Sequence, residues 1–141
     1  MTSILLVEDS APDAMLIRQA LHEAGVEGTV EVATDGVQAL ERLRRGPAPD
    51  LMLLDLNLPR KDGRAVLAEM SCDDTMRQIP VIVLTTSSAP HDVRFAYAHC
   101  ANSYVRKPLG LDRLVETARA IREFWLATAT LPTAALDGQR R

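Results

Sequence analysis

Five short apolar runs, separated by segments of helical periodicity, constrain the fold of this chain more than any other feature. The runs are residues 4–7, 30–33, 51–54, 81–84 and 103–105. Three of them are continuous rather than alternating, which is typical of parallel strands that helices cover on both faces. Each parallel pair needs a helical crossover, so the order strand then helix, five times over, predicts a doubly wound α/β sheet with five helices.

Capping residues mark the ends of the intervening helices. Ser10 can cap the first helix, and Gly25 can stop it. Thr34 or Asp35 can cap the second, and Pro90 can open the fourth. The residues that we expect to face the core are, helix by helix, Ile17, Ala20, Leu21 and Ala24; Val37, Leu40 and Leu43; Val66, Leu67 and Met70; Val93, Ala96, Tyr97 and Cys100; and Leu114, Ala118, Ile121 and Trp125.

Length and charge narrow the possible partners. The 141 residues fit one compact domain. A formal net charge of -3 offers no long-range attraction for nucleic acid or an anionic membrane, so we expect neither as a partner. The segment before Glu8 is too short for a signal peptide. Cys72 and Cys100 cannot build a disulfide framework, and we expect both to be buried in a cytoplasmic protein.

Charged and polar residues stand where the apolar runs end. Glu8 and Asp9 follow the first run, Asp55 the third and Thr85 the fourth, while Lys107 comes soon after the fifth. The carboxyl ends of parallel strands meet at one edge of an open sheet, so we expect these side chains to converge there. Three acids repel one another unless a cation lies among them. All candidate ligands are oxygens, which favours Mg2+ or Mn2+ over Zn2+.

This combination of groups suits the capture of a phosphoryl group. Asp55 is the best candidate for the attacking oxygen, because it lies on the central acid-bearing segment, whereas Glu8 and Asp9 are better placed as metal ligands. The metal and Lys107 would neutralise the charge of the transferring group, and the product would be an acyl phosphate. Each acid alone could merely cap a helix or open a turn, but their coincidence at separate strand ends favours a site.

Four segments together resemble the receiver domain of two-component response regulators. They are residues 4–10 (ILLVEDS), 50–59 (DLMLLDLNLP) followed by Asp62-Gly63, 79–85 (IPVIVLT) and 104–108 (YVRKP). The resemblance covers about residues 3–126 and has all four segments in order at receiver spacing. It implies a flavodoxin-like fold with strand order 2-1-3-4-5, a receiver domain over residues 1–126, and a tail over 127–141 without an output domain.

The resemblance implies a role for each residue of the acidic site. Asp55 would accept the phosphoryl group from a phosphohistidine on a sensor histidine kinase. Glu8 and Asp9 would hold Mg2+, directly or through water. Asp55 and the backbone carbonyl of Asn57 would complete the protein ligands.

The same resemblance implies a switch beside the site. Thr85 would bond a phosphate oxygen, Lys107 would pair with the phosphoryl charge, and the rotamer of Tyr104 would follow Thr85. The Lys107-Pro108 bond would be cis. The residues that would influence the loss of the acyl phosphate are Asn57, Thr86 and Ser87.

A finer resemblance concerns the subfamily. Residues 55–64 (DLNLPRKDGR), 84–88 (LTTSS) and 124–126 (FWL) look like the stand-alone receivers found beside phytochrome-type histidine kinases in bacteria. This implies a bacteriophytochrome as the kinase, and a homodimer through the face made by the fourth helix, the fifth strand and the fifth helix. Phe124 lies about 100° around the helix from the core residue Trp125 and is the expected contact with a partner chain.

The sequence thus predicts a single-domain response regulator, a phosphoacceptor signalling protein rather than an enzyme acting on other molecules. An alternative is a phosphatase or phosphotransferase of the haloacid-dehalogenase kind, which also forms an aspartyl phosphate. That class places a second aspartate where this chain has Asn57, and it needs a cap and more length. A nucleotide-binding module is disfavoured because no glycine-rich loop follows the first strand. The intact Thr85 and Lys107 argue against a degenerate receiver that serves only for docking.

Overall fold

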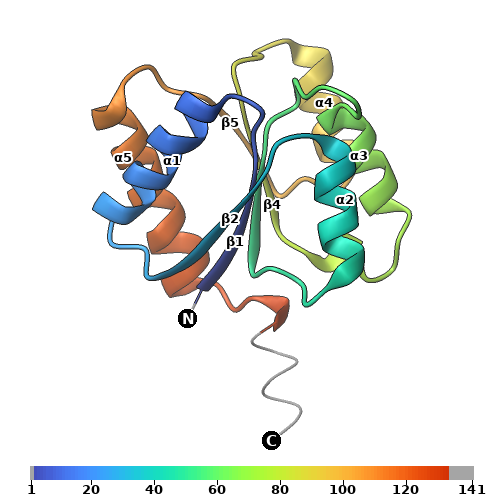
Figure 1. Ribbon diagram of the computed structural model, residues 1–141, viewed down its shortest axis with the longest axis horizontal. Coiled ribbons are helices and arrows are strands. Elements are labelled where there is room, and N and C mark those ends of the chain that lie inside the picture. Colours follow the sequence, from blue (N-terminus) through green and yellow to red (C-terminus); the bar gives the residue numbers. More distant parts are fainter. Residues whose placement is uncertain (1, 134–141) are drawn as a thin grey trace, which may run out of the picture.

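A five-stranded parallel sheet forms the centre of the molecule in the computed structural model, which describes residues 2–133 (Figure 1). The strands are β1 (Thr2–Val7), β2 (Gly28–Ala33), β3 (Leu51–Leu54), β4 (Val81–Thr85) and β5 (Ser103–Arg106). Their order across the sheet is β2-β1-β3-β4-β5, and every neighbouring pair is parallel. The predicted fold class and strand order are therefore confirmed.

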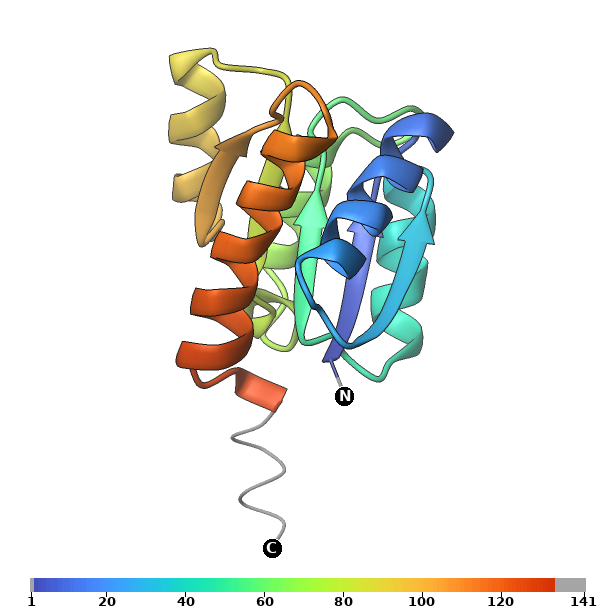
Figure 2. The same ribbon diagram turned by 90° about the vertical axis from the view of Figure 1, so that its left-hand side faces the viewer.

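Helices cover both faces of the sheet. They are α1 (Ala11–Glu23), α2 (Gly36–Arg45), α3 (Gly63–Ser71), α4 (Pro90–Ala98) and α5 (Leu111–Ile121), with a short 3-10 helix η1 (Met76–Gln78) before β4 and a π-helical extension η2 (Arg122–Thr128) after α5. Helices α1 and α5 lie together on one face, whereas α2, α3 and α4 lie on the other (Figures 1 and 2). Among the described residues, no helix is both long and apolar enough to cross a membrane.

Two apolar clusters, one on each face, hold the layers together. Neighbouring strand residues alternate between them, so that Leu53 belongs to the cluster with α1 and α5 and Leu54 to the cluster with α2 and α3. Strands β1, β3 and β4 are buried on both sides, as their continuous apolar runs predict. The predicted caps also form: Ser10 Oγ accepts from the backbone N–H of Asp13, and Asp35 caps α2.

The predicted inward face of α4 is correct for Ala96 and wrong for Tyr97 and Cys100. Asp92 and Ala96 are buried in this helix, whereas Tyr97 is 51% exposed and Cys100 is exposed beyond the helix end. Apolar periodicity selects Tyr97, but the carboxylate of Asp92 pairs with Arg64 of α3 and fixes a different face of the helix against the sheet. A tertiary ion pair thus overrides the local apolar pattern.

Two smaller expectations are also wrong. Cys72 and Cys100 are both exposed, because each follows the last turn of a helix where the chain reaches the surface. The cis peptide bond in the described part of the chain is Gly46-Pro47, so Lys107-Pro108 is trans. The two isomers of an X-Pro bond differ by only about 0.5–1 kcal/mol, which is why the dipeptide alone does not select one.

The chain after η2 folds back to the amino ends of the strands. The hydroxyl of Thr133 donates to Asp50, whose other carboxylate oxygen accepts from the backbone N–H of Ser3 at 2.8 Å. The predicted tail over 127–141 therefore begins within η2, and its residues 134–141 lie outside the described part of the chain.

Candidate functional site

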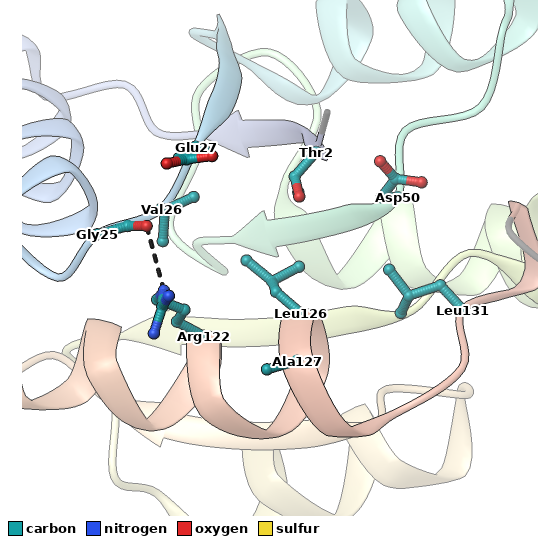
Figure 3. A pocket seen from close by; sticks show the side chains of 9 residues that line it. All are labelled: Thr2, Gly25, Val26, Glu27, Asp50, Arg122, Leu126, Ala127 and Leu131. Carbon is teal, nitrogen blue, oxygen red and sulfur yellow. Dashed lines mark hydrogen bonds between the residues drawn. The ribbon is translucent and has the colours of Figure 1, made fainter.

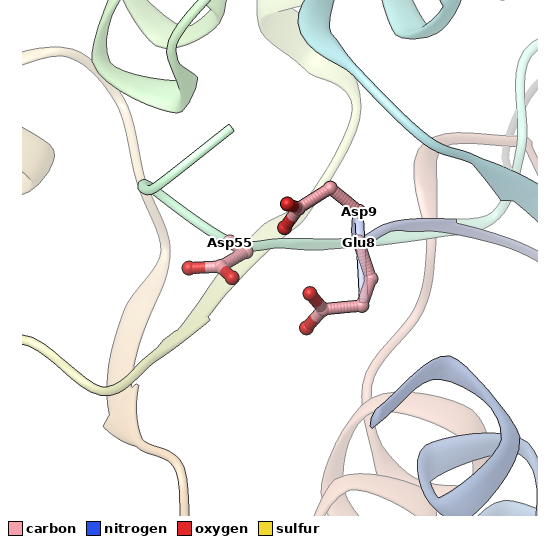
Figure 4. A group of neighbouring side chains, drawn as sticks. All are labelled: Glu8, Asp9 and Asp55. Carbon is pink, nitrogen blue, oxygen red and sulfur yellow. The ribbon is translucent and has the colours of Figure 1, made fainter. Parts of the chain in front are cut away.

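Three carboxylates gather at the carboxyl ends of β1 and β3. Glu8 and Asp9 follow β1 directly, and Asp55 follows β3. The pairing of Val7 with Leu54 sets the two strand ends side by side, and the Asp55 N–H donates to the carbonyl of Val7 at 3.1 Å. One carboxylate oxygen of each acid lies within 4.8 Å of the others, and Figure 4 shows the three groups around a common space. Glu8 and Asp55 are buried, whereas Asp9 is exposed.

Lys107 supplies the positive charge at this edge. Its side chain is 11% exposed and makes ion pairs with Glu8, with Asp55 Oδ2 at 3.2 Å and with Asp13 Oδ2 at 3.2 Å. Burial of the ammonium lowers its pKa, but the contacts with Glu8 and Asp55 outweigh burial and raise the pKa of Lys107 above its ordinary value. Burial raises the pKa of Glu8, and the ion pair with Lys107 offsets this only in part.

Asp55 is held at both of its carboxylate oxygens. The hydroxyl of Thr85, which is fully buried at the end of β4, donates to Oδ1 at 2.8 Å. The backbone N–H of Asn57 donates to the same oxygen at 3.2 Å, while Lys107 Nζ lies at 3.2 Å from Oδ2. This carboxylate is thus fixed in one orientation, with hydrogen-bond donors already directed at it.

The loop between β3 and α3 is locked by contacts that sequence reasoning missed. Gly63 donates to the carbonyl of Leu56 at 2.9 Å, and a Cβ on Gly63 would lie only 2.2 Å from the carbonyl oxygen of Asp55. On the α2 side, Gly36 donates to the carbonyl of Lys61 at 3.1 Å. The Asp62-Gly63 pair was visible in the sequence only as a motif, since close backbone approach leaves no periodic signal.

Of the two predicted switch residues, Thr85 contacts Asp55 directly, whereas Tyr104 does not. Tyr104 is half-buried on β5, and its hydroxyl donates to the backbone carbonyl of Ser87 at 2.8 Å. The hydroxyl of Ser87 donates to Asp92. Thr86 and Lys107 line a cavity of about 240 Å3 on the α1 side. Asn57, the remaining predicted ligand, is exposed.

A larger cavity lies at the opposite end of the sheet. It measures about 490 Å3 and lies between the start of β1 and η2 (Figure 3). Arg122 closes one wall by donating to the carbonyl of Gly25 at 3.1 Å. The predicted site residues do not line it. Glu8 and Asp9 instead line another cavity, of about 620 Å3, together with residues of α1.

Comparisons with known proteins agree with this geometry. Residues 4–119 match the family model of the response regulator receiver domain. Response regulator Rcp1 of Synechocystis is 42% identical over 137 residues, which cover 93% of each chain. The crystal structure of the phosphorylated cyanobacterial phytochrome response regulator RcpA is similar with a TM-score of 0.87 at 44% identity, covering 94% of this chain and 99% of that one. The crystal structure of the Mn2+-bound form of Rcp1 is similar with a TM-score of 0.86 at 40% identity, and it covers 94% of this chain and 99% of that one.

Proposed function

The chain belongs to the response regulator receiver family, and we propose that it accepts a phosphoryl group from a sensor histidine kinase on Asp55. The proposed receiver unit spans residues 1–126. The observation that carries the proposal is the Asp55 carboxylate, held by Thr85 and Lys107 within 4.8 Å of two further acids. The haloacid-dehalogenase alternative finds no support, since the match over residues 4–119 is to the receiver family.

The chemistry requires little covalent machinery beyond Asp55. A carboxylate oxygen attacks the phosphorus of a phosphohistidine, the P–N bond breaks, and its electron pair leaves with the imidazole. Lys107 neutralises negative charge on the transferring group, and Thr85 donates a hydrogen bond to one of its oxygens once the phosphoryl group is in place. The same site would later release phosphate to water, with Asn57, Thr86 and Ser87 modulating that rate.

The donor set of the acidic cluster fits Mg2+ or Mn2+. All three side-chain donors are carboxylates, which are the ligands that hard divalent cations prefer. Lys107 is shared among several acids and does not balance their charge. Glu8, Asp9 and Asp55 would hold the ion together with the backbone carbonyl of Asn57. When bound, the ion neutralises the acids and the incoming phosphoryl oxygens.

The signal would leave the site through the face made by α4, β5 and α5. Tyr104 lies on β5 of this face and is half-buried, and we infer that its side chain moves when Thr85 moves. Phe124, at 55% exposure after α5, would contact a second copy of the chain in a homodimer, while Trp125 packs on the core. The names of the relatives support a phytochrome-type kinase as the phosphoryl donor.

Small phosphoryl donors test the proposal directly. With Mg2+ and acetyl phosphate, the intact mass should increase by one phosphoryl group, and Asp55→Asn should abolish the increase. A matched control is Asp73→Asn, in an exposed loop outside the site. Labelling of Asp55→Asn to the wild-type level, or no labelling of the wild type, would exclude Asp55 as the acceptor.

Sedimentation tests the signalling step separately. With beryllofluoride and Mg2+, we expect the wild-type protein to show a larger dimer fraction than without them, and Tyr104→Ala to weaken this dependence. If Tyr104→Ala retained the full dependence, the proposed route through β5 would be wrong.

A further inference from the structure

An ion pair between the half-buried Arg64 and the buried Asp92 joins α3 to α4 outside the acidic site. Arg64 of α3 donates from Nε to Asp92 Oδ1 at 2.7 Å and from Nη2 to Asp92 Oδ2 at 2.8 Å. The Asp92 side chain is 4% exposed. Arg64 also pairs with Asp62 at 2.9 Å, which fixes the guanidinium from its other side. A bidentate pair of this kind is among the strongest polar contacts in proteins.

The same carboxylate holds the loop that follows the switch hydroxyl Thr85. Ser87 Oγ donates to Asp92 Oδ2 at 2.6 Å and accepts from the backbone N–H of Ala89 at 3.3 Å. The backbone carbonyl of Ser87 accepts from the Tyr104 hydroxyl at 2.8 Å. An unbroken series of hydrogen bonds thus runs from α3, through the loop over 86–89, to β5.

Apolar packing holds α4 only weakly. Its buried residues are Asp92 and the small Ala96, whereas α5 buries Leu114, Val115, Ala118 and Ile121. An alanine contributes little apolar surface, so the position of α4 depends mainly on the contacts of Asp92. The buried carboxylate would be costly without its partner, which makes Arg64 necessary for this placement.

We propose that Arg64 and Asp92 are positioning residues for the switch. They fix the 86–89 loop and the first turn of α4 relative to α3, so that a displacement of Thr85 reaches Tyr104 through Ser87. This inference rests on the proposed function. It also gives Ser87 a definite task, because its hydroxyl is engaged by Asp92 and acts on the position of the loop.

Hydrogen exchange of the whole chain, without metal or phosphoryl donor, tests the positioning itself. In Arg64→Gln, peptides covering 86–98 should exchange at least about tenfold faster, as expected on losing a charge-assisted hydrogen bond, while β1 and β3 keep the wild-type rate. Arg64→Lys should fall between the two, since lysine cannot bridge both oxygens. The control Arg42→Gln breaks a similar pair, to Glu31 at 2.9 Å, far from α4 and should leave 86–98 unchanged. Wild-type exchange in Arg64→Gln would overturn the proposal.

A second arm adds Mg2+ and beryllofluoride. Fluorine NMR should show binding at Asp55 in wild type and Arg64→Gln alike, but the change in exchange at the peptide containing Tyr104 should fall by at least about half in the variant. An equal change in both would overturn the proposal. If the wild type bound no beryllofluoride, the proposed function would fail, and the metal-free comparison would still decide whether the pair positions the loop. If Arg64→Gln unfolds, Arg64→Gln with Asp92→Asn replaces it, because the double variant leaves no buried charge unpaired.

Discussion

Substitution of Gly63 by alanine should displace the backbone that carries Asp55. The new Cβ would lie 2.2 Å from the carbonyl oxygen of Asp55 and 2.7 Å from Cα of Leu56, whereas ordinary contact begins at 3.4 Å. Both neighbours are backbone atoms and cannot rotate away, so the loop must shift by about 1 Å. Overpacking of this kind costs about 1–3 kcal/mol in the free energy of unfolding. A misplacement of about 1 Å in a reacting group can reduce its rate about 100-fold.

Two measurements separate these effects. Urea unfolding followed by the fluorescence of Trp125, the single tryptophan, gives the stability, and the rate of labelling by acetyl phosphate gives the reactivity. The control Gly46→Ala strains a left-handed residue with φ 52° but meets no atom within 4 Å. The Gly46→Ala protein should be less stable than the wild type but should be labelled by acetyl phosphate at the wild-type rate. A Gly63→Ala protein within about 0.5 kcal/mol of wild type, labelled at the wild-type rate, would refute the steric argument.

Three further outcomes follow from other parts of the molecule. Because the Trp125 side chain packs on the core, Trp125→Ala should lower the free energy of unfolding by about 2 kcal/mol. Phe124 is exposed, so Phe124→Ala should change the free energy of unfolding by less than about 0.5 kcal/mol. Urea unfolding followed by circular dichroism measures both variants. Mg2+ should raise the Tm of the wild type in a thermal scan, chelation should reverse the increase, and a full increase in Asp9→Asn would contradict the ligand assignment. The ion pair with Arg64 holds the pKa of Asp92 below its ordinary value of 3.8. The ionised Asp92 therefore stabilises the fold fully above the unfolded-state pKa, and this stabilisation is lost as the pH falls through the lower pKa of the folded state. Acid titrations of stability should therefore show the gap between wild type and Asp92→Asn shrinking from about pH 5 to about pH 2; a constant gap would contradict the shift.

Features set by local sequence were predictable, and features set by distant partners were not. The strands lie where the apolar runs predict, and the convergence of Glu8, Asp9 and Asp55 follows from the parallel sheet itself. The orientation of α4 could not be predicted, because it depends on Arg64, which lies 28 positions before Asp92. Apolar periodicity predicts only which apolar residues of a helix face the core, so it cannot predict that a charged residue such as Asp92 is buried.

The same limit applies to the loop over 56–62. Its backbone is held by Gly36 and Gly63, whose missing side chains let other segments approach to distances that a Cβ would forbid. A glycine in a sequence shows that close approach is permitted, but it does not show which segment makes it. The route from Tyr104 to Ser87 is a contact of this tertiary kind as well.

The positions of the first and last described residues determine how the protein can be immobilised for binding measurements. Thr2 begins β1, and Thr133 bonds to Asp50, which also accepts from the N–H of the neighbouring Ser3, whereas the acids lie at the carboxyl ends of the strands. Six residues of β1 span about 20 Å at about 3.3 Å each. A sensor chip or a bead coupled through either end would leave the acids open to the solution, whereas a dye attached there would be too remote to report directly on their occupancy.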